Sequence, residues 1–134
     1  MKIWLLDTNT ISAAVHRRSE TLDERLLELG ALPLRVSAIS YGEVQFGLAQ
    51  KPAARHLARS IADFFRNVQI LDWTESTAEV YGTLRADMKK AGKALSPLDM
   101  LIAAHALEAH ATLVTSDRAF RFVPGLDTVD WIEA

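Results

Sequence analysis

Short runs of apolar residues alternate along this chain with longer stretches in which apolar residues recur every three or four positions. The short runs predict strands of a parallel sheet, because strands covered on both faces are apolar throughout rather than alternating. We expect five such strands, at residues 2–6, 34–37, 68–71, 112–115 and 128–132.

The longer stretches predict helices, and capping residues or a proline mark where they begin. The expected starts are Thr21, Ser40, Pro52, Thr74 and Ser96. Thr21 and Glu24 have the spacing of a capping box, and glycines at positions 30 and 92 suit helix ends. The alternation predicts a three-layer α/β/α fold with a mostly parallel central sheet of about five strands. We expect residues 1–134 to form a single domain.

Composition excludes several classes of site. The chain has 134 residues, no cysteine and a formal net charge of −2. Disulfides, thiolate metal sites and cysteine nucleophiles are therefore excluded, and nucleic-acid binding would need a local basic patch. No apolar run approaches the ~20 residues of a membrane span, and the apolar start is too short for a signal sequence. A cytoplasmic protein without a membrane segment is expected.

Four acidic residues stand where an α/β fold could gather them. Asp7 and Asp117 follow predicted strands, whereas Glu43 and Asp99 each lie three residues after a serine. Ligands of such folds bind at the carboxyl ends of the strands, where the strand order reverses. Carboxylates that share a pocket repel one another unless a cation neutralises them, so the pattern indicates a site for a hard metal ion.

Each acid also has a purely structural interpretation. Glu43 and Asp99 could complete capping boxes with the serines that precede them, while Asp7 and Asp117 could cap the segments that follow. Position alone does not separate these alternatives, because Asp72 also ends an apolar run. We interpret Asp72 as a loop residue beside Trp73.

Four sequence blocks, in order over nearly the whole chain, carry a family resemblance. They are Leu-Asp-Thr-Asn at 6–9, Val-Ser-Ala-Ile-Ser-Tyr-Gly-Glu-Val-Gln-Phe-Gly at 36–47, Leu-Asp-Met-Leu-Ile-Ala-Ala-His-Ala at 98–106 and Leu-Val-Thr-Ser-Asp at 113–117, the last followed by Val-Pro-Gly-Leu at 123–126. With these blocks the chain resembles PIN-domain ribonucleases of the VapC toxin family of type II toxin–antitoxin systems. One departure is Ser116, where many relatives carry Asn.

The resemblance implies a metal-dependent endoribonuclease that uses Mg²⁺ or Mn²⁺. Asp7 and Asp99 would be direct metal ligands, while Glu43 and Asp117 would bind through water, hold a second ion or orient the attacking water. Thr115 and Ser116 would hold a phosphate or a ligand carboxylate, and Thr8 and Asn9 would support the site. The alternative is a degenerate, non-catalytic PIN domain that binds RNA or protein.

The resemblance also implies partners. We expect a VapB-type antitoxin, an RNA substrate, contact with operator DNA only through the antitoxin, and a homodimer. Arg85, Lys89 and Lys93 would form a basic stripe for RNA if their helix continues to its end; the alternative is that they lie on a solvated helix face. The four histidines, His16, His56, His105 and His110, follow no metal-binding or catalytic pattern and are expected on the surface or at helix caps.

Overall fold

A computed structural model of the protein describes residues 1–66 and 68–132. The strands are β1 Trp4–Leu6, β2 Leu34–Ser37, β3 Gln69–Leu71, β4 Thr112–Val114 and β5 Thr128–Val129. The helices are α1 Thr8–Val15, α2 Glu20–Leu29, α3 Ala38–Ala49, α4 Arg55–Phe65, α5 Glu75–Lys90, α6 Pro97–Glu108 and the 3₁₀ helix η1 Arg118–Phe122. All five predicted strands are therefore present, each within its expected range or equal to it.

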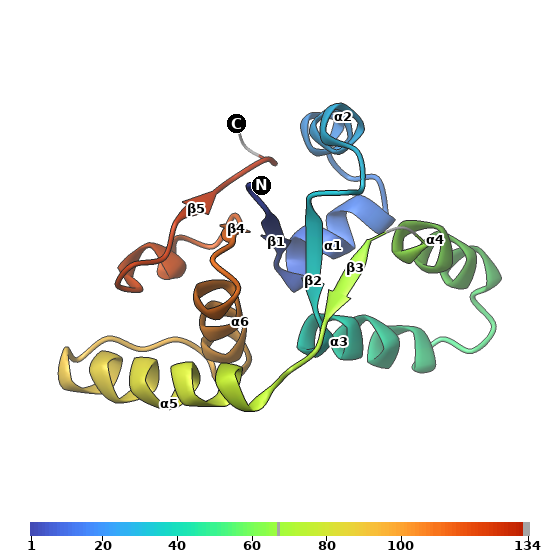
Figure 1. The fold of residues 1–134 in the computed structure, drawn as a ribbon. Helices are drawn as coiled ribbons and strands as arrows, with labels where there is room; N and C mark the ends of the chain where they lie inside the picture. The colour runs from blue at the N-terminus through green and yellow to red at the C-terminus, as the bar shows by residue number, and fades with distance from the viewer. Residues whose placement is uncertain (67, 133–134) are drawn as a thin grey trace.

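The strands form one sheet in the order β3-β2-β1-β4-β5, and every neighbouring pair is parallel. Trp4 pairs with Leu34 of β2 on one side and with Thr112 of β4 on the other. Strands β2 and β3 therefore extend the sheet on one side of β1, and the later strands β4 and β5 extend it on the other. The strand order reverses between β1 and β4. Figure 1 shows β1 at the centre, with α4 beyond β3, with α3 below the ends of β2 and β3, and with β5 on the opposite side.

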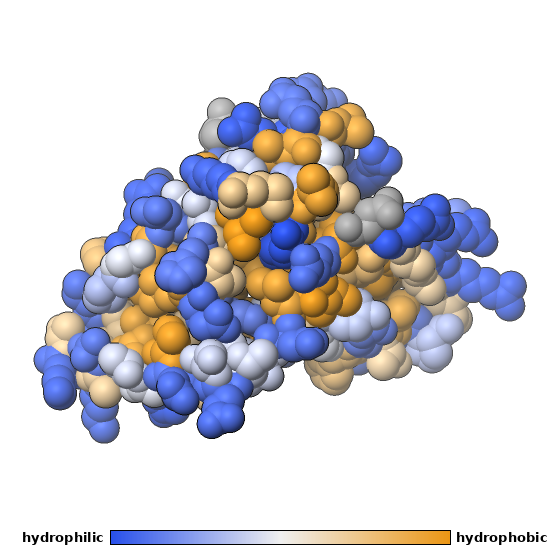
Figure 2. Space-filling view, viewed as in Figure 1, coloured by the Kyte–Doolittle hydropathy of each residue, from blue (hydrophilic) through white to orange (hydrophobic). Residues whose placement is uncertain are grey.

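Successive residues of the central strands point into two different cores. Leu5 and Leu113 pack with α5 and α6, while Leu6 and Val114 pack with α1, α2 and Trp131. The alternation follows from the pleat of a strand, which sends neighbouring side chains to opposite faces. The sheet is thus covered on both faces, which confirms the three-layer α/β/α prediction. In Figure 2 apolar residues gather around β2 and β3, while hydrophilic residues cover the outer end of α4.

Helix starts differ from the predicted positions more than the strands do. Ser19 rather than Thr21 caps α2, accepting a hydrogen bond from the Leu22 backbone, and Ser37 rather than Ser40 caps α3. Helix α4 begins at Arg55, three residues after Pro52. In the first two cases, two candidate caps lie within three residues and the strand or turn before the helix decides which residue is extended. The predicted caps Thr74 and Ser96 are both confirmed.

Within residues 1–66 and 68–132, no helix combines the length and the apolar character that a membrane crossing requires.

Candidate functional site

Asp7 is the buried acid at the carboxyl end of β1. Its side chain is 5% exposed, and its Oδ1 accepts a hydrogen bond of 2.7 Å from the backbone N–H of Thr10. This bond caps α1, so the structural role expected for Asp7 is present. The Thr115 side chain, at the end of neighbouring β4, also hydrogen-bonds the carboxylate. Asp7 therefore lies at the point where the strand order reverses.

The surroundings of Asp7 disfavour its charge. Burial raises the pKa of the Asp7 carboxyl, and the negative charge of Asp99 raises it further, while hydrogen bonds from Thr115 and Thr10 act in the opposite direction. Removal of a carboxylate from water favours its protonated form, and a like charge nearby adds to that effect. A cation beside Asp7 and Asp99 would relieve both penalties.

Asp99 reaches this region from the first turn of α6. Its backbone N–H donates to the Oγ of Ser96 at 3.2 Å, which caps the helix. The side chain is half-buried. A carboxylate in the first turn of a helix interacts favourably with the positive end of the helix dipole. The negative charge of Asp99 acts on the buried carboxyl of Asp7.

Glu43 lies in a separate cleft beside this pair of acids. The cleft, of about 240 Å³, is formed by α1, α3 and α4, and Thr8 and Lys51 also line it. Because Ser37 caps α3, the capping box of Glu43 with Ser40 is wrong. Ser40 instead accepts a hydrogen bond of 3.0 Å from the hydroxyl of Thr8. In the described part of the chain, the Glu43 carboxylate forms no hydrogen bond or ion pair.

Asp117 is exposed on the other side of Asp7 and caps η1. Its Oδ1 accepts from the Ala119 N–H at 2.9 Å, and its own N–H donates to the hydroxyl oxygen of Thr115 at 3.0 Å. Thr115 thus touches both Asp7 and the backbone of Asp117, so it couples two of the four acids. The capping role of Asp117 is confirmed.

Ser116 is directed away from Asp7. Its hydroxyl donates to Oδ1 of Asp130 at 2.8 Å, and the same oxygen accepts from the Ile132 N–H at 2.8 Å. Asp130 directly follows β5, the neighbour of β4, and so stands at the same sheet edge as Asp7. The sequence does not single out Asp130, because the predicted strand 128–132 extends past it; its place directly after β5 is the signal that identifies it. Asn9 is exposed on α1.

The four predicted acids do not form a single metal-binding cluster. Among the residues that the structure describes, no three or more histidine, aspartate or glutamate side chains are arranged to hold a metal ion. Mg²⁺ usually keeps several waters and binds through one or two carboxylates together with substrate phosphates. The pair of Asp7 and Asp99 fits that mode of binding, with Glu43 and Asp117 on either side.

His105 is the clearest departure from the predicted roles. It is 1% exposed rather than on the surface, and its Nδ1 lies 2.7 Å from the Oγ of Ser37. Burial lowers the pKa of the ring, while the charge of Glu108 and a hydrogen bond to the Asp72 backbone raise it. The neutral ring ties α6 to the ends of β2 and β3. The expectation of a surface or cap role for His105 is wrong, because α6 buries this position.

The predicted basic stripe ends before its last member. Helix α5 stops at Lys90, and Gly92, with a φ of +69°, turns the chain before Lys93. The guanidinium of Arg85 donates to the Tyr81 hydroxyl at 2.8 Å. Arg85 and Lys89 remain on one exposed helix, whereas Lys93 lies over the ring of Phe122.

Comparisons with known proteins agree with the fold. A family model described as PIN domain matches residues 4–126. The chain is 28% identical over 131 residues to ribonuclease VapC2 of Rickettsia felis, covering 96% of this chain and 98% of that protein. It is also 28% identical over 129 residues to the tRNA(fMet)-specific endonuclease VapC of Salmonella typhimurium, covering 96% and 97%. A chain in the crystal structure of DNA-bound VapBC from Salmonella typhimurium superposes with a TM-score of 0.90 at 28% identity, covering 98% and 99%.

Proposed function

The chain belongs to the PIN-domain family, and we propose that it is a metal-dependent endoribonuclease acting as the toxin of a type II toxin–antitoxin pair. The observation that carries the proposal is the buried carboxyl of Asp7 at the strand-order reversal, next to the negative charge of Asp99. A capping role alone does not require burial of the carboxylate. Relatives along nearly the whole chain are named as ribonucleases and as a tRNA-specific endonuclease.

Asp7 and Asp99 would hold Mg²⁺ or Mn²⁺. The bound ion would supply neutralisation of phosphate charge and a water of lowered pKa. The Thr10 backbone N–H holds the Asp7 carboxylate at 2.7 Å, and the Thr115 side chain also hydrogen-bonds it. Glu43 and Asp117 would bind the ion through water, hold a second ion or orient the attacking water. Thr8 fixes α1 against α3 through Ser40, which places the Glu43 cleft beside Asp7.

The proposed partner is a VapB-type antitoxin, through which contact with operator DNA would occur. Similar structures are complexes of this kind, including VapBC from Rickettsia felis bound to a promoter DNA fragment. An acidic pocket attracts basic side chains, so an antitoxin segment with such residues would both bind the pocket and block it. We further propose that the chain forms a single domain over residues 1–134, acts in the cytoplasm and self-associates as a homodimer.

Cleavage assays distinguish this proposal from a degenerate binding module. The purified protein is expected to cut RNA in Mg²⁺ or Mn²⁺ and to stop in chelator; the RNA panel includes tRNA because of the Salmonella relative. Asp99→Asn should abolish cleavage while it leaves RNA binding and the far-ultraviolet circular dichroism spectrum close to those of the parent. RNA binding without cleavage by the parent, with every RNA and metal tested, would establish the non-catalytic alternative.

A further inference from the structure

A polar cleft of about 560 Å³ opens at the carboxyl ends of β4 and β5, next to Asp7. Thr115, which hydrogen-bonds the Asp7 carboxylate, forms part of its wall, and Arg118 and Arg121 of η1 form another part. The cleft therefore shares Thr115 and Asp117 with the proposed catalytic site. It lies away from the Glu43 cleft, on the side of the sheet that ends in β5.

The side chains of η1 lie on different faces of this short helix. A 3₁₀ helix has three residues per turn, so residues three apart share a face. Phe120 and Val123 are 1% and 3% exposed and anchor the segment in the core. Arg118 and Arg121 share another face and are both exposed. Neither arginine forms an ion pair with any residue in 1–66 or 68–132, so both guanidinium groups are available to an anion.

Phe122 ends this segment and is 60% exposed. The ammonium of Lys93 lies 5.8 Å from the centre of its ring. Phe122 directly follows Arg121 but does not line the cleft, so its exposed ring, with Lys93 beside it, lies on an adjoining face of η1 outside the cleft. Proteins hold single-stranded nucleic acid with cations along the phosphates and aromatic rings under unpaired bases.

We propose that an unpaired RNA segment flanking the scissile phosphate runs along this cleft, with phosphates on Arg118 and Arg121, and continues past η1 so that one base stacks on Phe122 outside the cleft. The inference rests on the proposed function and adds a path for the substrate. The cleft also contains Asp117 and Asp130. The Asp130 carboxylate is occupied by Ser116 and the Ile132 N–H, and that of Asp117 caps η1. A base on Phe122 must be unpaired, because stacking requires a free face, so single strands should bind better than duplexes.

The test compares variants of exposed residues, which leave the core intact. Phe122→Leu keeps an apolar side chain but removes the ring, and it should raise the KM for an unpaired RNA roughly tenfold. Its kcat should stay within about twofold of the parent, and Phe122→Tyr should restore KM. Arg118→Gln with Arg121→Gln should flatten the plot of log affinity against log salt by about 1.4.

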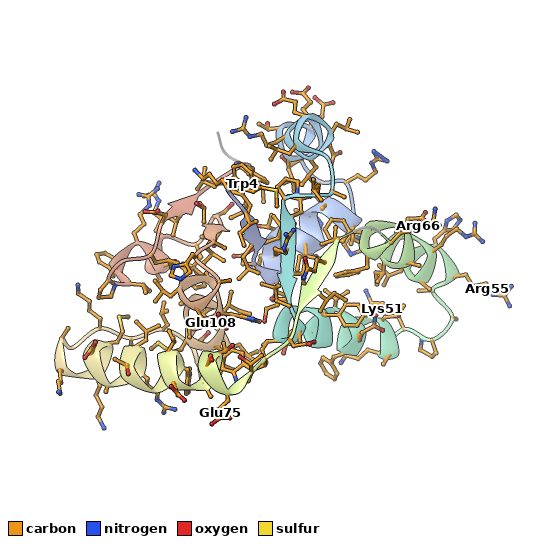
Figure 3. The ribbon with its side chains drawn as sticks, in the orientation of Figure 1. Trp4, Lys51, Arg55, Arg66, Glu75 and Glu108 are labelled. Atoms are coloured by element: carbon orange, nitrogen blue, oxygen red, sulfur yellow. The ribbon has the colours of Figure 1, made fainter. Side chains whose placement is uncertain are left out.

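The matched control is Arg55→Gln with Arg59→Gln. These two arginines are exposed on α4, and Figure 3 shows that the labelled Arg55 side chain points outward, on the opposite side of the view from β5. This pair should leave both KM and the salt slope unchanged. The proposed RNA path is wrong if the parent cleaves RNA while Phe122→Leu keeps the parental KM and the Arg118→Gln, Arg121→Gln variant keeps the parental salt slope.

Binding to uncleaved RNA separates this inference from the proposed function. The binding measurement uses Asp7→Asn protein, alone and combined with the substitutions of the cleft and of Phe122. If the parent never cleaves RNA but the variants at Arg118, Arg121 and Phe122 still lose affinity for single-stranded RNA, the proposed RNA path is supported and the proposed nuclease function is wrong. Equal affinity of all variants for single-stranded and duplex RNA would contradict the path whatever the parent's activity.

Discussion

Asp7→Asn tests whether the Asp7 carboxylate is strained by the fold in the absence of metal. The asparagine side chain has nearly the same size, and its oxygen can still accept the 2.7 Å hydrogen bond from Thr10. Asn and Asp are about equally good N-caps, whereas Ala at an N-cap costs roughly 1 kcal/mol. The substitution therefore removes the charge and keeps the cap, and Asp7→Ala removes both.

The raised pKa of Asp7 fixes the sign of the effect. Because burial and the charge of Asp99 raise this pKa above its ordinary value of 3.8, the folded protein binds the proton more tightly than the unfolded chain does. The stabilisation from Asp7 is therefore complete below pH 3.8 and is lost as the pH rises through the folded-state pKa. In chelator at pH 7, Asp7→Asn should melt at the parental temperature or above it. Its advantage should disappear as the pH is lowered into that window.

Thermal melts of the three proteins, in chelator and in millimolar Mn²⁺, give the comparison. In chelator Asp7→Ala should melt below Asp7→Asn by roughly 3–5 °C, which corresponds to about 1 kcal/mol in a domain of this size. Metal at about a hundred times its dissociation constant should stabilise the parent by ~2.7 kcal/mol, and both variants far less. Equal metal-induced shifts in parent and Asp7→Asn, with a loss of stability for Asp7→Asn in chelator, would mean that Asp7 is only a helix cap.

Three further outcomes follow from the same structure. Burial lowers the pKa of His105, so the unfolded chain binds the proton of this residue more tightly than the folded protein does. The parent should therefore lose stability as the pH falls below ~6.5. Denaturant unfolding at pH 7.5 and 5.5 should show a smaller loss of stability in His105→Gln, and equal losses would contradict the lowered pKa of His105. Ser37→Ala removes both the α3 cap and the partner of a buried ring nitrogen, so it should cost about 1–3 kcal/mol, more than Ser96→Ala at the exposed cap of α6; equal costs would argue against the buried bond. Arg85→Gln with Lys89→Gln should flatten the salt dependence of RNA binding without changing cleavage-site preference, and an unchanged slope would assign these residues to a solvated helix face.

The strands were predictable from sequence because each is a short apolar run, and sheet burial on both faces leaves little choice of position. Helix starts were less predictable, since Ser19 and Thr21, or Ser37 and Ser40, compete as caps and only the approach of the preceding segment decides. His105 illustrates a further limit. The α6 residues from 100 to 104, and 106 and 107, are all apolar, which signals a buried helix, but the partner Ser37 is 68 positions away.

The candidate site was predictable in part. Asp7 and Asp72 both follow apolar runs, and sequence position does not separate them. The fold separates them, because β1 is central and buries the residue at its end, whereas β3 is an edge strand and leaves Asp72 exposed. The depth of Asp7, its contact with Thr115 and the different clefts beside Glu43 and Asp117 all depend on strand order and helix packing.

RNA cleavage by Asp7→Asn, set beside Asp72→Asn, is the most direct test of the acidic site. Both substitutions neutralise one carboxylate after a strand, but Asp7 is buried next to Asp99 and Asp72 is exposed in a loop. In Mg²⁺ or Mn²⁺, parent and Asp72→Asn should cut end-labelled RNA at the same positions and similar rates, while Asp7→Asn, purified in parallel and folded, should not cut above the chelator background. Full cleavage by Asp7→Asn in preparations free of contaminating nuclease would contradict the account.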